Sequence, residues 1–149
     1  MQIALDLGYH QFSPPGLFYV RDESEALTRL QTAAELFRKD GIGKFAVFLR
    51  ETGEIVGTCG LDPWMIHGKP EVELSNRYLL KFWYQGFALE ASRKVLEYGF
   101  NVLNYPQIYG CFVSQNRGPK GIVDKLGFTF DCQLEHAGAV HELYRLNRL

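Results

Sequence analysis

A run of small and aromatic residues, Phe82-Trp83-Tyr84-Gln85-Gly86-Phe87-Ala88-Leu89-Glu90-Ala91, gives the clearest chemical signal in the sequence. It follows a strand-like stretch and opens directly into a helix. The first turn of a helix leaves its N–H groups without internal partners and carries partial positive charge. Gly86 and Ala88 have almost no side chain, so an anion such as a pyrophosphate could approach this backbone closely. A turn that merely packs tightly would explain the same residues, so the run alone leaves both interpretations open.

The elements that would position this turn follow from the hydrophobic periodicity. Asp22 is expected to cap a helix that ends at Gly41, and Asn116 a short helix that ends at Gly127. A longer helix is expected over Ala88–Leu103. Strands are expected at Phe45–Arg50, Ile55–Leu61, Glu71–Leu79, Gln107–Ser114, Phe128–Leu134 and Val140–Leu146, with Asp62-Pro63-Trp64 in a loop. This order predicts one α/β (α+β) domain over residues 1–149, built on a mixed, mostly antiparallel central sheet.

Composition narrows the class of partner. The chain has a net charge of −1 and scattered basic residues, which disfavours binding to nucleic acid or to an anionic membrane surface. No apolar run approaches the ~20 residues of a membrane span, and the start of the chain lacks the pattern of a signal peptide. The expected location is therefore the cytoplasm.

The cysteines and histidines show no metal-binding pattern along the sequence. Three cysteines are widely spaced and form no CxxC pair, which favours small buried residues over a zinc site or a disulfide. The four histidines have no metal-ligand spacing with one another or with a cysteine. His136 and His141 could face each other across the last hairpin, but surface positions explain them better and are expected. These residues are Cys59, Cys111, Cys132, His10, His67, His136 and His141.

Two blocks of the sequence resemble the GNAT (Gcn5-related) N-acetyltransferases, and most closely the branch of ribosomal-protein N-terminal acetyltransferases. That branch typically has Trp-Gly-x-Gly-Tyr-Ala-Thr-Glu-Ala in its coenzyme loop, and this chain has Trp83–Ala91 in its place. The second family block has Asn-x-x-Ser followed by an apolar helix that ends in Lys-Leu-Gly-Phe. Here it begins at Asn116 and ends with Lys125-Leu126-Gly127-Phe128. The resemblance covers about Asp22 to Leu146 and implies the GNAT fold, with helices on both faces of the sheet.

The resemblance implies N-acetyl transfer from acetyl-CoA, as co-substrate, to a primary amine on a protein N-terminus or a small molecule. The amine would attack the thioester directly, without a covalent enzyme intermediate. Glu73 is the first candidate for the general base; a solvated or salt-bridged strand residue is the alternative. The backbone near Leu74 and Ser75 would hold the thioester carbonyl, and Asn116 would touch the pantetheine arm as well as cap its helix. The pyrophosphate would lie on Gln85, Gly86, Phe87 and Ala88, and the pantetheine arm in a splay between Glu73–Arg77 and the strand Gln107–Ser114.

Three residues depart from the family pattern. Tyr84 replaces a glycine inside the coenzyme loop. The N–H groups of Gln85 to Ala88 would form a cradle for the anion, and the position of the Tyr84 ring decides whether this cradle stays open. Pro119 and Val123 stand where the family has a serine and often a tyrosine, the usual acids for the departing thiolate. Tyr78 or Tyr109 could substitute, although each is better explained as a core aromatic of a strand. A thiolate can leave without an acid, but more slowly.

The N-terminal segment Met1–Val20 is too short and too broken by Pro14-Pro15-Gly16 to supply the first family strand and its connection. The sheet would then expose an edge near Phe45–Leu49 or Ile55–Leu61, which suggests a homodimer. The loop Trp64-Met65-Ile66-His67 could line the pocket for the acceptor or simply anchor the chain. Two other functions stay open: a CoA-binding module without turnover, and a partner subunit with an empty cleft.

Overall fold

The computed structural model describes residues 22–149, to which all statements below refer. Helix α3 (Glu23–Asp40) begins where the sequence predicts. The Asp22 carboxylate accepts a hydrogen bond of 2.8 Å from the Glu25 backbone N–H, and Gly41 ends the helix with φ 70°. Glycine adopts this left-handed conformation without steric cost, so both ends of α3 are determined by local sequence.

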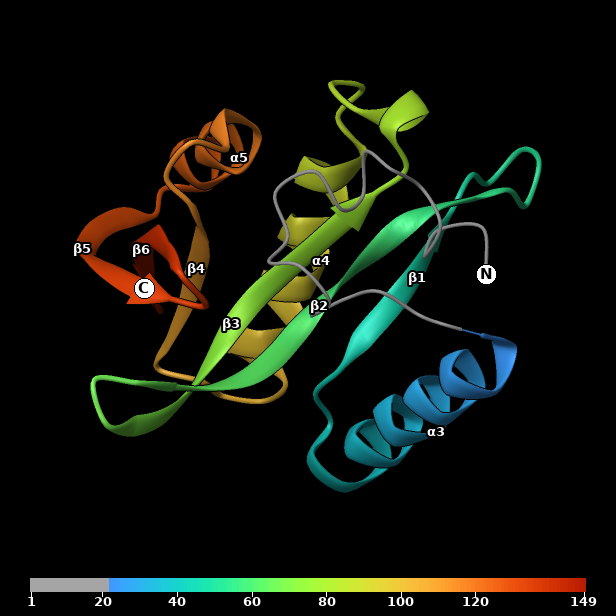
Figure 1. Cartoon of the computed structure of the whole chain (residues 1–149), viewed down its shortest axis with the longest axis horizontal. Coiled ribbons are helices and arrows are strands. Elements are labelled where there is room, and N and C mark those ends of the chain that lie inside the picture. The colour runs from blue at the N-terminus through green and yellow to red at the C-terminus, as the bar shows by residue number, and fades with distance from the viewer. Residues whose placement is uncertain (1–21) are drawn as a thin grey trace.

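Six strands form one sheet in the order β1-β2-β3-β4-β6-β5 (Figure 1). Their neighbours are antiparallel except for β3 and β4, which run parallel. The predicted mixed, mostly antiparallel sheet is confirmed. The strands are β1 (Lys44–Phe48), β2 (Ile55–Ile66), β3 (Lys69–Tyr78), β4 (Gln107–Val113), β5 (Thr129–His136) and β6 (Ala139–Asn147).

The predicted loop Asp62-Pro63-Trp64 is wrong, because β2 continues through it to Ile66. The antiparallel pairing with β3 extends from Gly57 to Ile66, and a tight turn at His67 and Gly68 closes the hairpin. Proline is tolerated in this strand because β1 pairs with β2 only as far as Gly60. Beyond that residue one side of β2 is an edge, where a missing N–H costs no ladder hydrogen bond.

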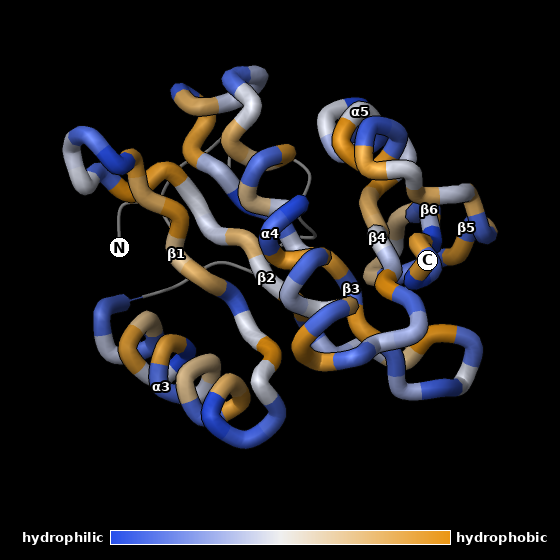
Figure 2. Tube along the Cα trace, turned by 180° about the vertical axis from the view of Figure 1, so that it is seen from behind, coloured by the Kyte–Doolittle hydropathy of each residue, from blue (hydrophilic) through white to orange (hydrophobic). Residues whose placement is uncertain are grey.

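Helix α4 (Phe87–Asn101) packs against the sheet and forms the main core with it. Helices α3 and α4 alternate between hydrophobic and hydrophilic segments, as amphipathic helices do (Figure 2). Gly99 lets α4 approach the sheet closely, because a Cβ there would lie 2.7 Å from Ile108 Cδ1. Phe37 of α3 contacts Phe45 of β1, which in turn contacts Tyr98 of α4, so α3 meets the sheet on the α4 side.

Strands β3 and β4 diverge after a single paired position, Glu73 with Tyr109. In Figure 1 the two strands form a V that opens toward the start of α4 and toward α5 (Arg117–Leu126). Along the V, β3 keeps its pairing with β2 and β4 keeps its pairing with β6, but β3 and β4 do not pair with each other. The geometry that the family resemblance implies for β3 and β4 is therefore present.

The sheet of the described residues ends at β1 on one side and at β5 on the other. The edge expected near Phe45–Leu49 is therefore found, whereas Ile55–Leu61 lies inside the sheet. The interpretation of Met1–Val20 as lacking the first family strand falls outside the described residues. Among residues 22–149, no helix has the length and apolar character to cross a membrane.

Candidate functional site

The start of α4 is an open helix end of the predicted kind. Gly86 is its N-cap with φ 92°, and no side chain of the described residues accepts a hydrogen bond there. The first helical hydrogen bond runs from the Glu90 N–H to the Gly86 carbonyl, so the N–H groups before Glu90 have no helical partner. Among residues 22–149, a Cβ on Gly86 would meet no atom within 4 Å, so no described group crowds this glycine.

Tyr84 adopts the conformation of the glycine that it replaces. Its φ is 60°, in the left-handed region that β-carbon-bearing residues seldom occupy. Its side chain is 91% exposed, so the ring does not fill the space in front of α4. Two side chains brace the same loop: Trp83 Nε1 donates to the Tyr78 carbonyl at 2.9 Å, and Gln85 Nε2 donates to the Lys81 carbonyl at 2.7 Å. The departure at Tyr84 thus leaves the cradle open.

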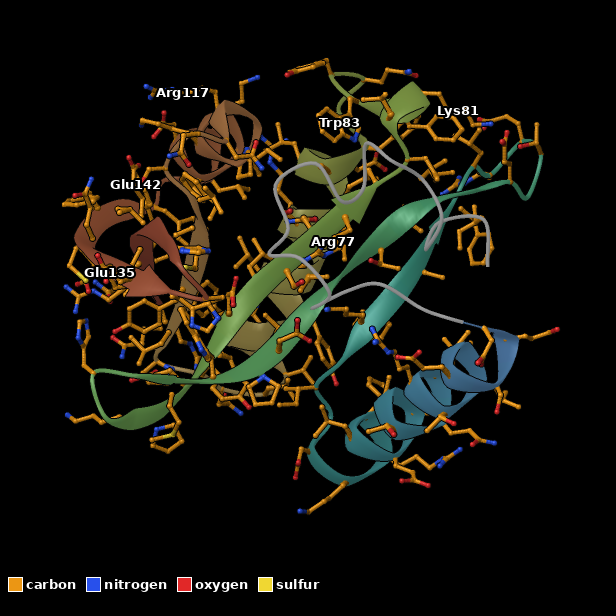
Figure 3. The ribbon with its side chains drawn as sticks, viewed as in Figure 1. Arg77, Lys81, Trp83, Arg117, Glu135 and Glu142 are labelled. Atoms are coloured by element: carbon orange, nitrogen blue, oxygen red, sulfur yellow. The ribbon has the colours of Figure 1, made fainter. Side chains whose placement is uncertain are left out.

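Helix α5 borders the other side of the V. Asn116 caps it, since its side chain accepts a hydrogen bond of 3.3 Å from the Gly118 N–H. The predicted cap is confirmed, while the contact of Asn116 with a pantetheine arm stays a prediction. Arg117 at the start of α5, and Lys81 and Trp83 beside the start of α4, lie on opposite sides of the open end of the V (Figure 3).

Glu73 lies where the V closes, at the single paired position of β3 and β4. Its side chain is half-buried, and this burial raises its pKa from 4.5 to about 7. The negative charge of Asp62 adds to the rise, whereas Lys44 and Arg77 oppose it. A hydrogen bond from the backbone of Cys111 holds the carboxylate against β4. The site thus has a carboxylate that exchanges its proton near neutral pH.

The other residues considered for catalysis lie either on the diverging part of β3 or in and around helix α5. Leu74 and Ser75 follow Glu73 on the diverging part of β3, Leu74 with its side chain in the core. Their role at a thioester carbonyl stays a prediction. Val123 is buried in the core, where it packs over Gly110, and Pro119 lies in the first turn of α5.

The two tyrosines considered as acids are both buried, as core aromatics would be. Burial raises the pKa of each phenol. The Tyr78 hydroxyl lies near Cys59 under α4, whereas Tyr109 stands beside Glu73 at the vertex of the V. The phenol of Tyr109 interacts with Glu71, Asp131 and Arg145, so a role of either tyrosine as an acid stays a prediction.

The far end of β3 carries a second group of polar side chains that sequence spacing did not reveal. The tip of the β2–β3 hairpin and strand β5 line a cavity of about 430 Å³. Its lining includes Trp64 to His67, so the residues considered for the acceptor loop do border a cavity. His67, Asp131 and Cys132 place a nitrogen, an oxygen and a sulfur atom within 4.8 Å of one another. No local spacing pattern signals this group, because His67 and Asp131 are 64 residues apart in the sequence.

The last hairpin brings two histidines together. The rings of His136 and His141 face each other with their centroids 5.6 Å apart. His141 is buried, so its expected surface position is wrong. Its Nδ1 lies 3.0 Å from the Ala139 carbonyl oxygen, which gives this buried ring a polar partner.

Comparison with known proteins agrees with this geometry. A family model described as an acetyltransferase (GNAT) domain matches residues 5–129. The chain belongs to the GNAT acetyltransferase family. An N-acetyltransferase of uncharacterised function from Bacillus licheniformis, p20, is 30% identical over 112 residues, which cover 72% of this chain and 60% of p20. The GNAT chain thus spans less than two thirds of the length of the curated relatives it matches.

Solved GNAT structures share the fold. The ribosomal-protein-S5-alanine acetyltransferase from Vibrio fischeri superposes with a TM-score of 0.78 at 17% identity, over 97% of this chain and 85% of that one. A GNAT-family acetyltransferase from Bacillus anthracis gives 0.76 at 18% identity, over 98% and 85%. At these identities the likeness concerns the fold alone.

Proposed function

We propose that this GNAT domain transfers an acetyl group from acetyl-CoA to a primary amine, on a protein N-terminus or a small molecule. The observation that carries the proposal is the half-buried Glu73, with its pKa raised to about 7, at the vertex of the V between β3 and β4. A base is most effective when its pKa lies near the working pH. Glu73 would take a proton from the amine, directly or through a water molecule.

The length of β3 supports the placement of Glu73 at one end of a bound pantetheine arm and of the start of α4 at the other. From Glu73 to Tyr78 the strand advances about 17 Å, at ~3.3 Å per residue, and the η1 turn (Leu80–Phe82) then leads to α4. This length is on the order of an extended pantetheine arm. The N–H groups of Gln85 to Ala88 would hold the pyrophosphate, and the arm would lie in the V.

Acetyl-CoA supplies an activated acyl thioester when bound. The chain's own groups would then do three things. The start of α4 holds negative charge, the backbone near Leu74 and Ser75 donates to the thioester carbonyl oxygen as charge develops there, and Glu73 accepts the proton of the amine. The amine nitrogen forms its bond to the acetyl carbon as the carbon–sulfur bond breaks, and the thiolate leaves.

A CoA-binding module without turnover is the second candidate, and a specific observation favours it. Neither Pro119 nor the buried Val123 offers a hydroxyl for the leaving thiolate. The third function, a partner subunit with an empty cleft, would require the Tyr84 ring to exclude the coenzyme, and the exposure of that ring argues against this.

The test is steady-state kinetics of thiol release from acetyl-CoA over pH 5.5–9, with a panel of amino-terminal peptides, polyamines and amino sugars. We expect Glu73→Gln to lower kcat/KM by roughly 10²–10³-fold and to abolish the rise in rate with an apparent pKa near 7. Acetyl-CoA affinity, measured by calorimetry, should stay unchanged.

Glu71→Gln is the matched control, because Glu71 lies two residues earlier on the same face of β3 and bonds Gln107 at 2.7 Å. It should keep most of the activity. Binding of acetyl-CoA by the unaltered protein without thiol release for any amine would establish the module instead. Equal losses in both variants would remove Glu73 from the role of base.

A further inference from the structure

The group His67, Asp131 and Cys132 lies at the far end of β3, away from the cradle at the start of α4. His67 Nε2 and Asp131 Oδ2 are 2.7 Å apart, and Cys132 Sγ completes a trio of donor atoms within 4.8 Å. The trio joins the tip of the β2–β3 hairpin to β5. His67 and Asp131 are 64 residues apart in sequence, and β4 and β6 lie between β3 and β5 in the sheet, so the fold of the chain and not strand pairing brings the three donors together.

We propose that His67, Asp131 and Cys132 bind a zinc ion through three protein ligands, with a fourth coordination position open to the neighbouring cavity. The donor set is one imidazole nitrogen, one carboxylate oxygen and one thiolate sulfur, all of which zinc accepts. A neutral imidazole with two anionic ligands gives a charge of −2, which balances the ion. This site lies beyond the proposed acetyl transfer and does not depend on it.

The local backbone explains how two consecutive residues of β5 reach the same ion. The pairing of β5 with β6 shifts between Phe130 and Cys132, which leaves Asp131 as the extra residue of a bulge. In a regular strand the side chains of consecutive residues point to opposite faces, and a bulge re-aims one of them. Without the bulge, Asp131 and Cys132 could not converge on one point.

The distances require only small adjustments. Tetrahedral zinc with bonds of ~2.0–2.3 Å separates its ligand atoms by roughly 3.3–3.6 Å. The His67 nitrogen and the Asp131 oxygen would move slightly apart, and the Cys132 sulfur would move inward. The side chain of His67 is 55% exposed and lies in a turn, so it can turn toward the ion, while that of Asp131 is 17% exposed and fixed by its surroundings.

The open position faces the cavity of about 430 Å³, which His67 and Cys132 help to line. A zinc site with three protein ligands keeps one position for water or for another ligand, unlike a closed structural site with four. The ion could therefore hold an anionic or thiol-bearing molecule in this cavity.

Cobalt(II) titration of the purified chain tests the proposal, because cobalt occupies zinc sites and a thiolate ligand gives an intense near-ultraviolet charge-transfer band. We expect one cobalt per chain, the thiolate band, and displacement by zinc. Zinc at about 100-fold above its Kd should raise the Tm by roughly 5–10 °C.

Matched variants make the result specific. Cys132→Ser and His67→Ala should lose the band, whereas Cys59→Ser, on the α4 side of the sheet, and His136→Ala, in the same cavity, should keep it. Circular dichroism verifies the fold of each variant. The absence of a thiolate band in the unaltered chain, or a band that survives Cys132→Ser, would overturn the proposal.

Discussion

The two ends of β3 are built in different ways. At the end that leads into η1 and α4, the proposed functional groups are backbone N–H groups of consecutive residues, fixed by Gly86 and by the left-handed Tyr84. At the other end, the proposed ligands are side chains of His67 in the β2–β3 turn and of Asp131 and Cys132 in β5, where a bulge lets the two consecutive residues reach the same point. The geometry of the first end depends on a few neighbouring residues. The geometry of the second end depends on contacts between segments that are far apart in the sequence.

This difference predicts how each end responds to substitution. A backbone site tolerates changes of an outward-pointing side chain, as the exposed ring of Tyr84 illustrates, but not changes that fill the space in front of the N–H groups. A side-chain site is lost when any one donor is removed. Glu73 lies between the two ends of β3. Its raised pKa depends on the packing of neighbouring strands around it, including β2 and β4.

Filling the backbone site should have the largest effect. Ala88→Glu places a carboxylate in the first turn of α4, where the helix dipole favours it, so stability should change by less than ~0.5 kcal/mol. The same charge repels a pyrophosphate, and we expect acetyl-CoA affinity to fall about 100-fold, or roughly 2.7 kcal/mol. Calorimetry with acetyl-CoA measures the loss.

Asn101→Glu is the control, because it adds the same charge at the opposite end of the same helix. Its affinity for acetyl-CoA should match that of the unaltered chain. An unchanged affinity in Ala88→Glu would show that the start of α4 does not hold the anion, and the distinction between the two ends of β3 would lose its functional meaning.

The pH dependence of stability should show an intermediate effect at Glu73. The unfolded chain releases this proton near pH 4.5, while the folded chain holds it to about pH 7. The folded state is therefore favoured below pH 4.5 and loses this advantage as the pH rises through 7. The full difference corresponds to ~3 kcal/mol, and partial exposure reduces the expected value to about 1–2 kcal/mol.

Glu73→Gln removes this titration. Urea unfolding at pH 5 and at pH 8 should show that the variant gains about 1–2 kcal/mol relative to the unaltered chain on going to the higher pH. A difference between the two proteins that stays constant from pH 5 to pH 8 would mean that the carboxylate of Glu73 is not strained by burial.

Sequence reasoning succeeded where the signal is local. The caps at Asp22 and Asn116, the glycine ends at Gly41 and Gly127, and the turn before α4 each depend on a few neighbouring residues. Hydrophobic periodicity then placed all six strands in order. The family blocks added the V between β3 and β4, which no periodicity reveals.

Sequence reasoning failed where a feature depends on contacts between segments that are far apart in the sequence. Pro63 signals a loop along the sequence, and only the end of β1 pairing at Gly60 explains why a strand accepts it. No spacing rule predicts the trio of His67, Asp131 and Cys132, because the hairpin tip meets β5 although β4 and β6 lie between β3 and β5 in the sheet. The raised pKa of Glu73 likewise depends on packing against three strands.

Substitutions of Tyr84 test the backbone conformation before α4, and we expect them to have a smaller effect on stability than Glu73→Gln. A residue with a Cβ in the left-handed region costs about 1–2 kcal/mol relative to its usual conformation, and glycine avoids that cost but loses more entropy on folding. Tyr84→Gly should therefore be about 0.5–1 kcal/mol more stable than Tyr84→Ala, which keeps the Cβ and loses the same exposed ring. Both variants should bind acetyl-CoA as the unaltered chain does, since the ring lies outside the space in front of α4. Thermal unfolding and calorimetry measure the two quantities, and equal stability of the glycine and alanine variants would contradict the strained conformation on which the cradle depends.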